Sequence, residues 1–577
     1  MKRMRRSLAI LLAAGLVLSL GACGGNAADD NTKNTNESTQ EAVESTADSK
    51  EQQTAESVPN GETPPEMPEG ETPPAMPEGE TPPEPPEGGM PGGNSQGGPG
   101  GQGGPGGNPP EMPSGETPPE PPEGGMPGGN GPGGSGQGGP GGNPPEKPGG
   151  QGGPGGSGQQ GPGGQGGPGG SSASIDYSAA TEITAAATQS GKTYKSSTSD
   201  ESALLISASD SVTIENATVT KTGDSDGGDS CNFYGVNAAV LVKDGAAAEI
   251  TGGTVTSDAN GANGIFCYGG NGGRNGASGD GTTLTVSDTV VTTTGDGSGG
   301  IMTTGGGVTI AKDLTVTTSG RSSAAIRTDR GGGTVSVDGG TYTTNGLGSP
   351  AIYSTAEITV SNATLVSNLS EGVCIEGLNS ITLNNCDLTA NNTKRNSNAC
   401  FLDSIMIYQS MSGDAASGTS HFTMTGGSLT SKSGHVFHVT NTNAVITLSG
   451  VEIVNEDADN VLISVCDDGW SGGSNKAELN ASAQKLFGAV LVGSNSELTL
   501  KLSDGSSFEG YVDGKITNAK GETVSSEAGK VSVTLDSTSS WTLTANSYVS
   551  EFNGNAANVV SNGFTLYVNG TALAGTK

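Results

Sequence analysis

A short alternation of apolar and small polar residues returns many times between Val212 and Leu500. Each copy places Val, Ile or Leu on both sides of a Thr or Ser and closes with Asn, Asp or Gly. Strict alternation of this kind is typical of a half-buried β-strand. Copies of the pattern include Val212–Asn216, Leu284–Asp288, Val335–Gly339, Ile358–Asn362, Ile381–Asn385 and Ile446–Gly450.

The spacing of these copies predicts a solenoid. Those that begin at Val335, Ile358 and Ile381 stand 23 residues apart, and others are separated by longer intervals. A repeat of this length suits one coil of a parallel β-helix with loops of variable length. Because no single coil can bury its apolar face, the coils must share one continuous core.

The residue that closes each copy predicts a corner. Asn, Asp and Gly tolerate the left-handed backbone that a tight turn requires. One copy departs from the pattern, since Lys312 stands at the corner position after Val308, Thr309 and Ile310. We expect a looser or differently bent corner there.

A second type of strand precedes the first in most coils. In its apolar pairs, such as Ile326-Arg327 and Ile352-Tyr353, the first residue is expected to face the core and the second to face solvent. The last stretch, with Trp541 and Tyr548, departs from the repeat as a capping segment should. The sequence therefore predicts an all-β, single-stranded parallel β-helix over residues 173–577, ending in a cap.

Equivalent outward positions of successive coils form a row, because neighbouring strands lie about 4.8 Å apart. Aromatic rings, a guanidinium and a carboxylate in such a row could follow an extended glycan. The alternative is an ordinary surface ladder in which Arg327 lies over Tyr353 as a cation–π pair. The predicted row is Met302, Arg327, Tyr353, Glu376 and Tyr408, with Gln409 and His438 beside its end, and the candidate ligand-binding residues are Arg327, Tyr353, Glu376, Tyr408 and Gln409.

The N-terminus indicates export. Basic residues from Lys2 to Arg6 precede an apolar run from Leu8 to Leu20, which is typical of a secretory signal and short for a membrane span. The run ends in Leu20-Gly21-Ala22-Cys23, which resembles the lipobox of bacterial lipoproteins. This resemblance implies a signal peptide over residues 1–22 and a lipid anchor on Cys23; the alternative is an ordinary cleaved signal followed by a chance cysteine.

Residues 23–172 are rich in Gly, Pro and acidic residues, with Gly-Glu-Thr-Pro-Pro phrases and long Gly-Gly-Pro-Gly-Gly runs. Such a composition cannot bury enough apolar surface to offset the entropy of ordering. We interpret it as a disordered tether between the anchor and the repeat domain. It would span roughly 65 Å as a random coil and about 450 Å as extended polyproline II.

The formal net charge of −34 excludes nucleic acid as a partner, because phosphate binding needs a basic face. Acidic clusters could bind Ca²⁺, although their spacing is not that of a known calcium loop, and solvated loops are the alternative. Apart from Ca²⁺, no cofactor is expected. The candidate carboxylates are Asp224, Asp226 and Asp229, with Asp467 and Asp468 as a second group.

The repeated phrases resemble those of the pectin-lyase-like right-handed β-helix proteins, within them the bacterial surface and adhesin-like group. The resemblance rests on Ala325–Gly333 and Thr423–Gly427 and covers about 400 residues, a domain length that suits ten or more coils. It implies a right-handed coil. It implies little about activity, because this fold carries lyases, hydrolases and proteins that only bind.

The residues do not match the hydrolases of this fold, whose Arg-Ile-Lys motif is missing. Should the chain be a polysaccharide lyase or glycoside hydrolase, Arg327, Asp329, Arg330 and Glu376 are the candidate catalytic residues. We expect instead a lipid-anchored bacterial surface protein that binds extracellular polysaccharide or a cell surface without catalysis. A third possibility is a spacer of the wall or biofilm.

Overall fold

The computed structural model describes residues 175–272, 278–470 and 472–577. The predicted signal peptide (1–22), the lipidation site Cys23 and the predicted tether (23–172) lie outside the described residues.

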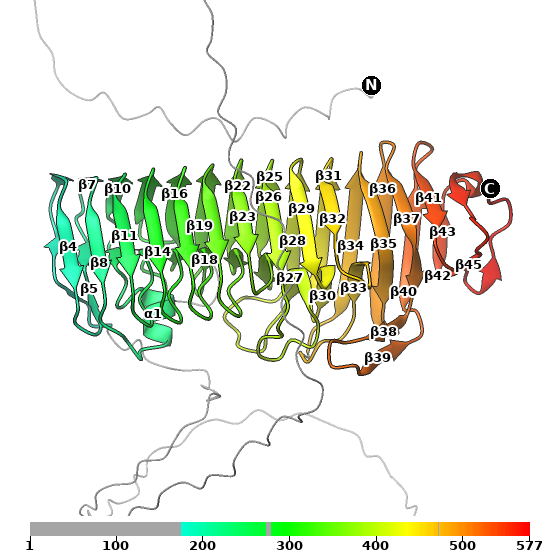
Figure 1. Cartoon of the computed structure of the whole chain (residues 1–577), viewed down its shortest axis with the longest axis horizontal. Helices are drawn as coiled ribbons and strands as arrows, with labels where there is room; N and C mark the ends of the chain where they lie inside the picture. The colour runs from blue at the N-terminus through cyan, green and yellow to red at the C-terminus, as the bar shows by residue number, and fades with distance from the viewer. Residues whose placement is uncertain (1–174, 273–277, 471) are drawn as a thin grey trace, which may run out of the picture. The chain divides into compact units, whose positions relative to one another are not determined.

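Parallel β-sheet dominates the described part of the chain, in which three long sheets lie side by side (Figure 1). The chain visits the sheets in a constant order, so neighbouring strands of each sheet come from successive coils. The predicted all-β, single-stranded parallel β-helix is therefore confirmed. Its coil is right-handed, as parallel crossover connections are.

Sheet 1 has 15 strands and corresponds to the second strand type of the repeat. Its strands are β2 (Glu182–Ile183), β6 (Leu204–Ile206), β9 (Val240–Val242), β12 (Ile265–Tyr268), β15 (Ile301–Thr304), β18 (Ile326–Thr328), β21 (Ile352–Ser354), β24 (Val373–Glu376), β27 (Asp403–Tyr408), β30 (His435–Thr440), β33 (Val461–Val465), β35 (Lys485–Val492), β37 (Ser507–Asp513), β41 (Ser540–Leu543) and β44 (Val559–Val560).

Sheet 2 has 14 strands and contains the alternating pattern itself. Its strands are β3 (Ala187–Ser190), β7 (Ser211–Glu215), β10 (Ala247–Thr251), β13 (Thr283–Ser287), β16 (Gly307–Lys312), β19 (Gly333–Asp338), β22 (Glu357–Ser361), β25 (Ser380–Asn384), β28 (Thr419–Thr425), β31 (Asn443–Ser449), β34 (Asn475–Ser482), β36 (Ser496–Ser503), β40 (Lys530–Leu535) and β43 (Glu551–Asn553).

Sheet 3 has 10 strands and follows sheet 2 after a tight corner. Its strands are β4 (Thr193–Ser196), β8 (Thr218–Lys221), β11 (Thr254–Ser257), β14 (Val290–Thr293), β17 (Thr315–Thr318), β20 (Thr341–Thr344), β23 (Thr364–Ser367), β26 (Asp387–Asn391), β29 (Ser428–Ser433) and β32 (Glu452–Asn455).

The remaining elements decorate the coils. A short helix, α1 (Asp229–Tyr234), precedes β9, and an antiparallel hairpin, β38 (Lys515–Thr517) and β39 (Thr523–Ser526), follows β37. The short strands β1 (Ser178–Ala179) and β5 (Glu201–Ser202) pair near the first coil. The C-terminal end carries a 3₁₀ turn, η1 (Ala556–Asn558), and a small sheet of β42 (Ser547–Val549), β45 (Leu566–Val568) and β46 (Thr571–Ala572).

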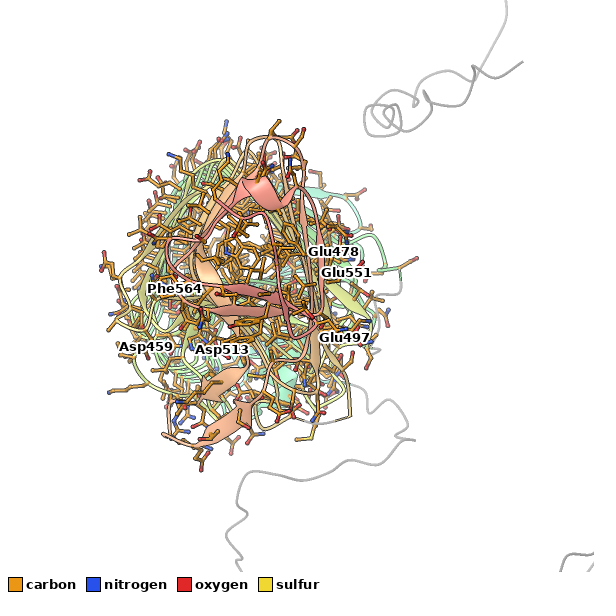
Figure 2. The ribbon with its side chains drawn as sticks, turned by 90° about the vertical axis from the view of Figure 1, so that its right-hand side faces the viewer. Asp459, Glu478, Glu497, Asp513, Glu551 and Phe564 are labelled. Atoms are coloured by element: carbon orange, nitrogen blue, oxygen red, sulfur yellow. The ribbon has the colours of Figure 1, made fainter. Side chains whose placement is uncertain are left out.

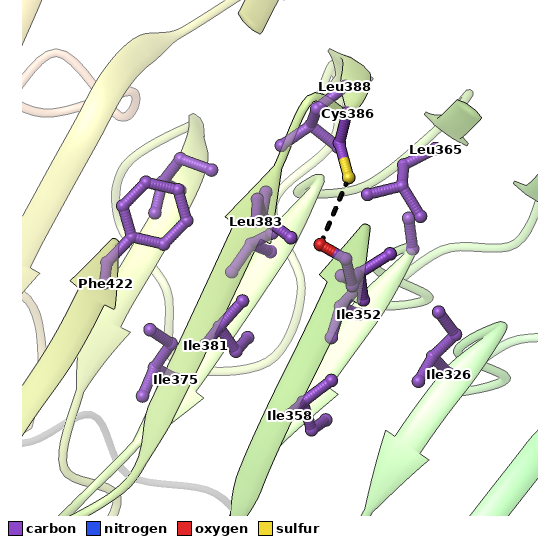
Figure 3. Packing of buried hydrophobic residues seen from close by; sticks show 14 of the residues in the cluster. Ile326, Ile352, Ile358, Leu365, Ile375, Ile381, Leu383, Cys386, Leu388 and Phe422 are labelled. Atoms are coloured by element: carbon purple, nitrogen blue, oxygen red, sulfur yellow. Dashed lines mark hydrogen bonds between the residues drawn. The ribbon is translucent and has the colours of Figure 1, made fainter. Parts of the chain in front are cut away.

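The inward side chains of the three sheets form one continuous core, as the repeat predicts. Figure 3 shows how Ile326 and Ile352 of neighbouring coils stack in this core. Trp541, predicted to belong to the cap, lies fully buried on β41 and stacks on Phe508 at 5.5 Å between ring centroids. Tyr548 lies in the terminal sheet and stacks on Tyr567. The coil of β41 therefore keeps an aromatic core, and β44 is the one strand of sheet 1 that follows it.

The corners between sheets 2 and 3 repeat as predicted. The closing residue of each copy has a left-handed backbone, with φ of 51° at Asn216 and at Asp288 and 76° at Gly339. Asn, Asp and Gly are thus selected by the backbone of the turn rather than by contacts of their side chains.

The expectation of an unusual corner at Lys312 was wrong. Lys312 is the last residue of β16, and Asp313, with φ of 51°, makes the same corner as Asp288. The alternation in β16 is shifted by one residue, so that Thr309 and Ala311 face inward while Ile310 is 46% exposed. A shift of one residue exchanges the two faces of a strand. The prediction failed because Ile310, being apolar, was assumed to point into the core.

This register predicts opposite costs for two Thr substitutions. Ile310→Thr places a hydroxyl in solvent, in a ladder with Thr285, and should change the free energy of unfolding by less than about 0.5 kcal/mol. Val286→Thr buries a hydroxyl in the core beside Ala311 and should cost about 1–3 kcal/mol. Urea denaturation of both variants measures the difference, and a larger loss for Ile310→Thr would contradict the register.

Candidate functional site

The outward face of sheet 1 is covered by loops, contrary to the expectation that its second residues face solvent. At one end Phe266 and Met302 lie fully buried beneath a segment that includes Ala238, which follows α1. At the other end Leu491 packs with Phe401 and with Ile516 of the β38–β39 hairpin. Figure 1 shows α1 and this hairpin on the same side of the coils. Between the two apolar clusters, from β18 to β33, the covered face is mixed, with charged and polar side chains beside Cys374 and Met406.

The predicted row is correct up to Tyr353 and shifts by two residues beyond it. Met302, Arg327 and Tyr353 are aligned. The next residues of the row are Cys374 and Met406, whereas Glu376 pairs with Tyr408 further along the same strands. A slip of two residues keeps each side chain on its face, so alternation alone could not distinguish the two registers. The candidate residues therefore still meet on one face.

The carboxylate of Glu376 is the centre of a hydrogen-bonded network. Tyr353 donates its hydroxyl hydrogen to Oε2 at 2.6 Å, and Tyr408 donates to the same oxygen at 3.2 Å. Ser410 donates to Oε1. Glu376 is 2% exposed, and burial raises the pKa of its carboxyl although these donors oppose the shift. Three of the predicted residues, together with Ser410, thus form one hydrogen-bonded cluster.

The arginines of this cluster are paired with carboxylates. Arg327 forms an ion pair with Asp329 at 2.5 Å and lies 5.6 Å from the centre of the Tyr353 ring, as the cation–π alternative predicts. Arg330 pairs with Asp414 and lies 4.0 Å over the ring of Phe233. Burial raises the pKa of Asp329, partly offset by Arg327. Of the four candidate catalytic residues, Arg327 and Glu376 thus lie on the outward face of sheet 1 and Asp329 and Arg330 in the turn after β18, and their charged groups all contact other protein groups.

A second polar cluster, which the sequence did not predict, lies under the 392–402 loop. Ser464 Oγ is 2.7 Å from Nδ1 of both His435 and His438, and His438 Nε2 is 3.4 Å from Asp468 Oδ2. The ring of Phe401 stacks on His438 at 4.5 Å between centroids. Burial lowers the pKa of His435 to about 3. Apart from the partly exposed His435, these groups are covered, so they hold the loop on the sheet.

Two more carboxyls are buried beside this cluster. Asp403 is 1% exposed, and burial together with the charges of Glu371 and Asp468 holds its pKa well above the ordinary value. Burial also raises the pKa of Glu371, to whose carboxylate Ser370 donates. Charged carboxylates so close together and away from water would repel one another, so the folded state favours protonated forms.

An open groove of about 490 Å³ adjoins the Glu376 network. Its walls are the loop 409–418, which follows β27, and residues 472–474, which precede β34; its floor is Asn441-Thr442-Asn443. The accessible groups include the side chains of Ser410, Ser417, Asn443 and Ser474, and charged side chains are absent from the described residues that line it. The predicted residue Gln409 lies in the wall and is largely buried.

Asn441 holds the groove open. Its Nδ2 donates to the carbonyl oxygen of Gln409 at 2.7 Å, and its Oδ1 accepts from the backbone N–H of Gly473. One side chain thus joins both walls. Two loops that are far apart in sequence are fixed relative to each other by these bonds, so the groove exists before a ligand arrives.

An aromatic pair lies at the start of both walls. The ring of Tyr408, which precedes Gln409, is 5.2 Å from that of Trp470, and the two planes are tilted by 58°. Trp470 is partly exposed. Trp470 could not be predicted because it lies outside the repeat. Only the fold shows that the segment 472–474, which begins two residues after it, lines a groove. The one sequence signal that could have pointed to Trp470 is the rarity of tryptophan, which occurs twice in the chain.

Three of the five carboxylates proposed for Ca²⁺ accept hydrogen bonds from protein groups. Asp224 accepts from the backbone N–H of Asn260, Asp467 accepts from Asn475, and Asp468 accepts from Cys400 N–H. Asp229 begins α1, and Asp226 lies in the loop before it. Among the described residues no three His, Cys, Asp or Glu side chains are grouped to hold a metal ion. The calcium site stays a prediction.

Comparison with known proteins identifies no relative: no protein family, curated protein or solved structure matches the chain. Within the described residues no helix has the length and apolar character needed to cross a membrane. The site must therefore be interpreted from its own chemistry.

The Asp403 environment predicts how stability depends on pH. A carboxyl whose folded pKa exceeds its unfolded value stabilises the fold at low pH, and this stabilisation is lost as pH rises above the ordinary Asp value towards the folded pKa. Each pH unit in that window costs about 1.4 kcal/mol per proton. Asp403→Asn should therefore flatten the fall in unfolding free energy between low and high pH.

Urea denaturation across the pH range measures this effect. Glu249→Gln, which removes an exposed charge from β10, serves as the control and should retain the wild-type slope. Equal slopes in wild type and Asp403→Asn would show that Asp403 is ionised alike in the folded and unfolded chains.

Proposed function

We propose that the groove between the 409–418 loop and residues 472–474 binds an uncharged segment of an extracellular carbohydrate, and that the β-helix is a binding head without catalysis. The observation that carries this proposal is the uncharged lining: amides and hydroxyls, together with the exposed side chain of Met411, border an open groove in a chain whose net charge is −34. An anionic polymer would meet no cation in the groove, so a neutral glycan is favoured over an acidic one.

The groove matches the chemistry of sugar hydroxyls. A sugar hydroxyl both donates and accepts hydrogen bonds, and so do Ser side chains; the Asn carboxamide offers both functions on separate atoms. Asn443 Oδ1 already accepts from Ser474 Oγ at 2.7 Å, which orients its amide. The partly exposed rings of Tyr408 and Trp470 add an apolar surface beside the groove, on which the face of a sugar ring can pack.

Some of the predicted residues would line the groove, and the others would hold the lining residues in place. Gln409 belongs to the groove wall, and its Nε2 donates to the carbonyl oxygens of Ser410 and Ala415 at 3.3 Å. Glu376 holds the hydroxyls of Tyr408 and Ser410, one on each side of Gln409. Arg327 and Tyr353 lie behind this layer. They would position the groove rather than touch the ligand.

The N-terminus would place this head outside the cell. A lipid anchor on Cys23 followed by the tether of residues 23–172 would present the β-helix beyond a bacterial membrane, where extracellular glycans are met. Two acyl chains hold a protein stably at a membrane, since each buried methylene contributes about 0.8 kcal/mol. The resemblance to pectin-lyase-like surface proteins supports the same assignment through the shape of the domain.

Substitutions in the groove should abolish binding without unfolding the head. Removing the exposed amide and hydroxyl together in Asn443→Ala/Ser417→Ala should weaken affinity for a glycan found on an array by about tenfold, since each hydrogen bond contributes about 0.5–1.5 kcal/mol. Ser417→Trp should fill the groove and remove binding. Titration calorimetry of the full chain measures both effects.

Asn384→Ala, on the outward side of β25 in sheet 2, is the matched control and should bind as the wild type does. Unchanged affinity in all groove variants would place the ligand elsewhere. Incubation with polygalacturonate, with and without Ca²⁺, tests catalysis: the absorbance of unsaturated product should stay flat. A rise that depends on Arg327 would make the protein a lyase.

The anchor has its own test. In a bacterial host, Cys23→Ser should prevent incorporation of labelled fatty acid and release the protein from the membrane fraction, because Cys23 would carry the acyl chains. Ser19→Ala, which leaves the cysteine in place, is the control. Labelling that persists in Cys23→Ser would refute lipidation at this residue.

A further inference from the structure

A second hollow, of about 340 Å³, lies on the outward face of sheet 1 near its C-terminal end. Residues of β35 and β37 and of the turn before β33 surround it. In the register of these strands Phe487 pairs with Glu509, and Ala489 pairs with Tyr511. In the first pair an aromatic ring thus stands beside a carboxylate, and in the second a small residue stands beside an aromatic ring.

Gly488, which lines the hollow, and Gly510, its partner on β37, cannot be replaced by residues with a side chain. Gly488 has φ of 108°, and a Cβ on it would lie 2.4 Å from the carbonyl oxygen of Asn460. A Cβ on Gly510 would lie 2.1 Å from the carbonyl oxygen of Gly488. Glycine is therefore required at both positions by the close approach of neighbouring backbones, and the coil fixes the backbone at Gly488, which lines the hollow.

Two carboxylates border the hollow without a protein partner. Asp459 and Glu509 have no side-chain hydrogen bond or ion pair within residues 175–272, 278–470 and 472–577. Asp513 lies on the same flank as Asp459 when the domain is viewed from its C-terminal end (Figure 2). Both are near Tyr511: burial, then Asp513 and Asp459, raise the pKa of its hydroxyl. The hollow is thus strongly negative.

We propose that this hollow binds a sugar that carries a free amine, as a unit of a deacetylated amino-sugar polymer does. Asp459 and Glu509 would accept charge-assisted hydrogen bonds from the ammonium group. The rings of Phe487 and Tyr511 would pack against the apolar face of the sugar and attract the cation. Asn460 and Thr544 offer groups that bond sugar hydroxyls.

This site is independent of the proposed groove. It uses other loops, and its charge selects a cation where the groove lining is uncharged. Loss of binding at one site leaves the other intact, so the two proposals fail separately.

Calorimetry of the full chain with a glucosamine tetramer, at about 0.15 M salt to screen diffuse attraction, tests the proposal. The tetramer should bind, and its N-acetylated counterpart, which lacks the positive charges, should bind at least about tenfold more weakly. The double variant Asp459→Asn/Glu509→Gln should weaken binding of the glucosamine tetramer by a similar factor. Lysine amide, an ammonium without a sugar, should bind more weakly than the tetramer.

Glu215→Gln/Glu249→Gln is the matched control, since it removes two charges from exposed positions of sheet 2 and should leave binding unchanged. Equal losses in both double variants would show that the net charge alone attracts the tetramer and would overturn the site. Equal affinity for the acetylated tetramer would overturn the role of the amine. Equal affinity for lysine amide would overturn the role of the sugar.

Discussion

The structure depends on the register of parallel strands from one coil to the next. Each coil is too small to bury its own apolar side chains, so Ile326, Ile352 and Val373 must lie above one another to exclude water. The same alignment pairs the backbone hydrogen-bonding groups of neighbouring strands and stacks their apolar side chains. The left-handed corners keep this alignment, because they return the chain at the same point in each coil. Loops elsewhere are then free to vary in length without disturbing the core.

The longer connections between strands lie mainly on the outward face of sheet 1. Long connections fold back over it and give the face apolar cover at both ends. In the middle the cover meets Arg327, Glu376 and His438, whose polar groups must find partners once water is removed. The ion pairs and the carboxyl-centred hydrogen bonds satisfy that requirement for Arg327 and Glu376, whereas Nε2 of His438 has no hydrogen-bond partner within the described residues. The price is a set of buried acids whose protonation is tied to folding.

The two open spaces lie where this cover stops. The groove beside Gln409 has an uncharged lining, whereas the hollow between Phe487 and Tyr511 is bordered by two carboxylates. Both are built on backbone positions that the coil fixes, through Asn441 in the first and Gly488 in the second. Should both spaces bind sugars as proposed, different segments of one polymer could occupy them.

The pattern of the sequence determined the strand type, the coil length, the corners and the single core, because these follow from local alternation and from the backbone of Asn, Asp and Gly. It also placed Arg327, Tyr353, Glu376 and Tyr408 on one face. It could not decide between registers that differ by two residues, as at Cys374, since both keep the alternation, and it misread β16, where Ile310 points outward. Only the tertiary structure brought Trp470 and Asn441 beside that face, because they lie in connections between strands whose positions depend on packing rather than on periodicity.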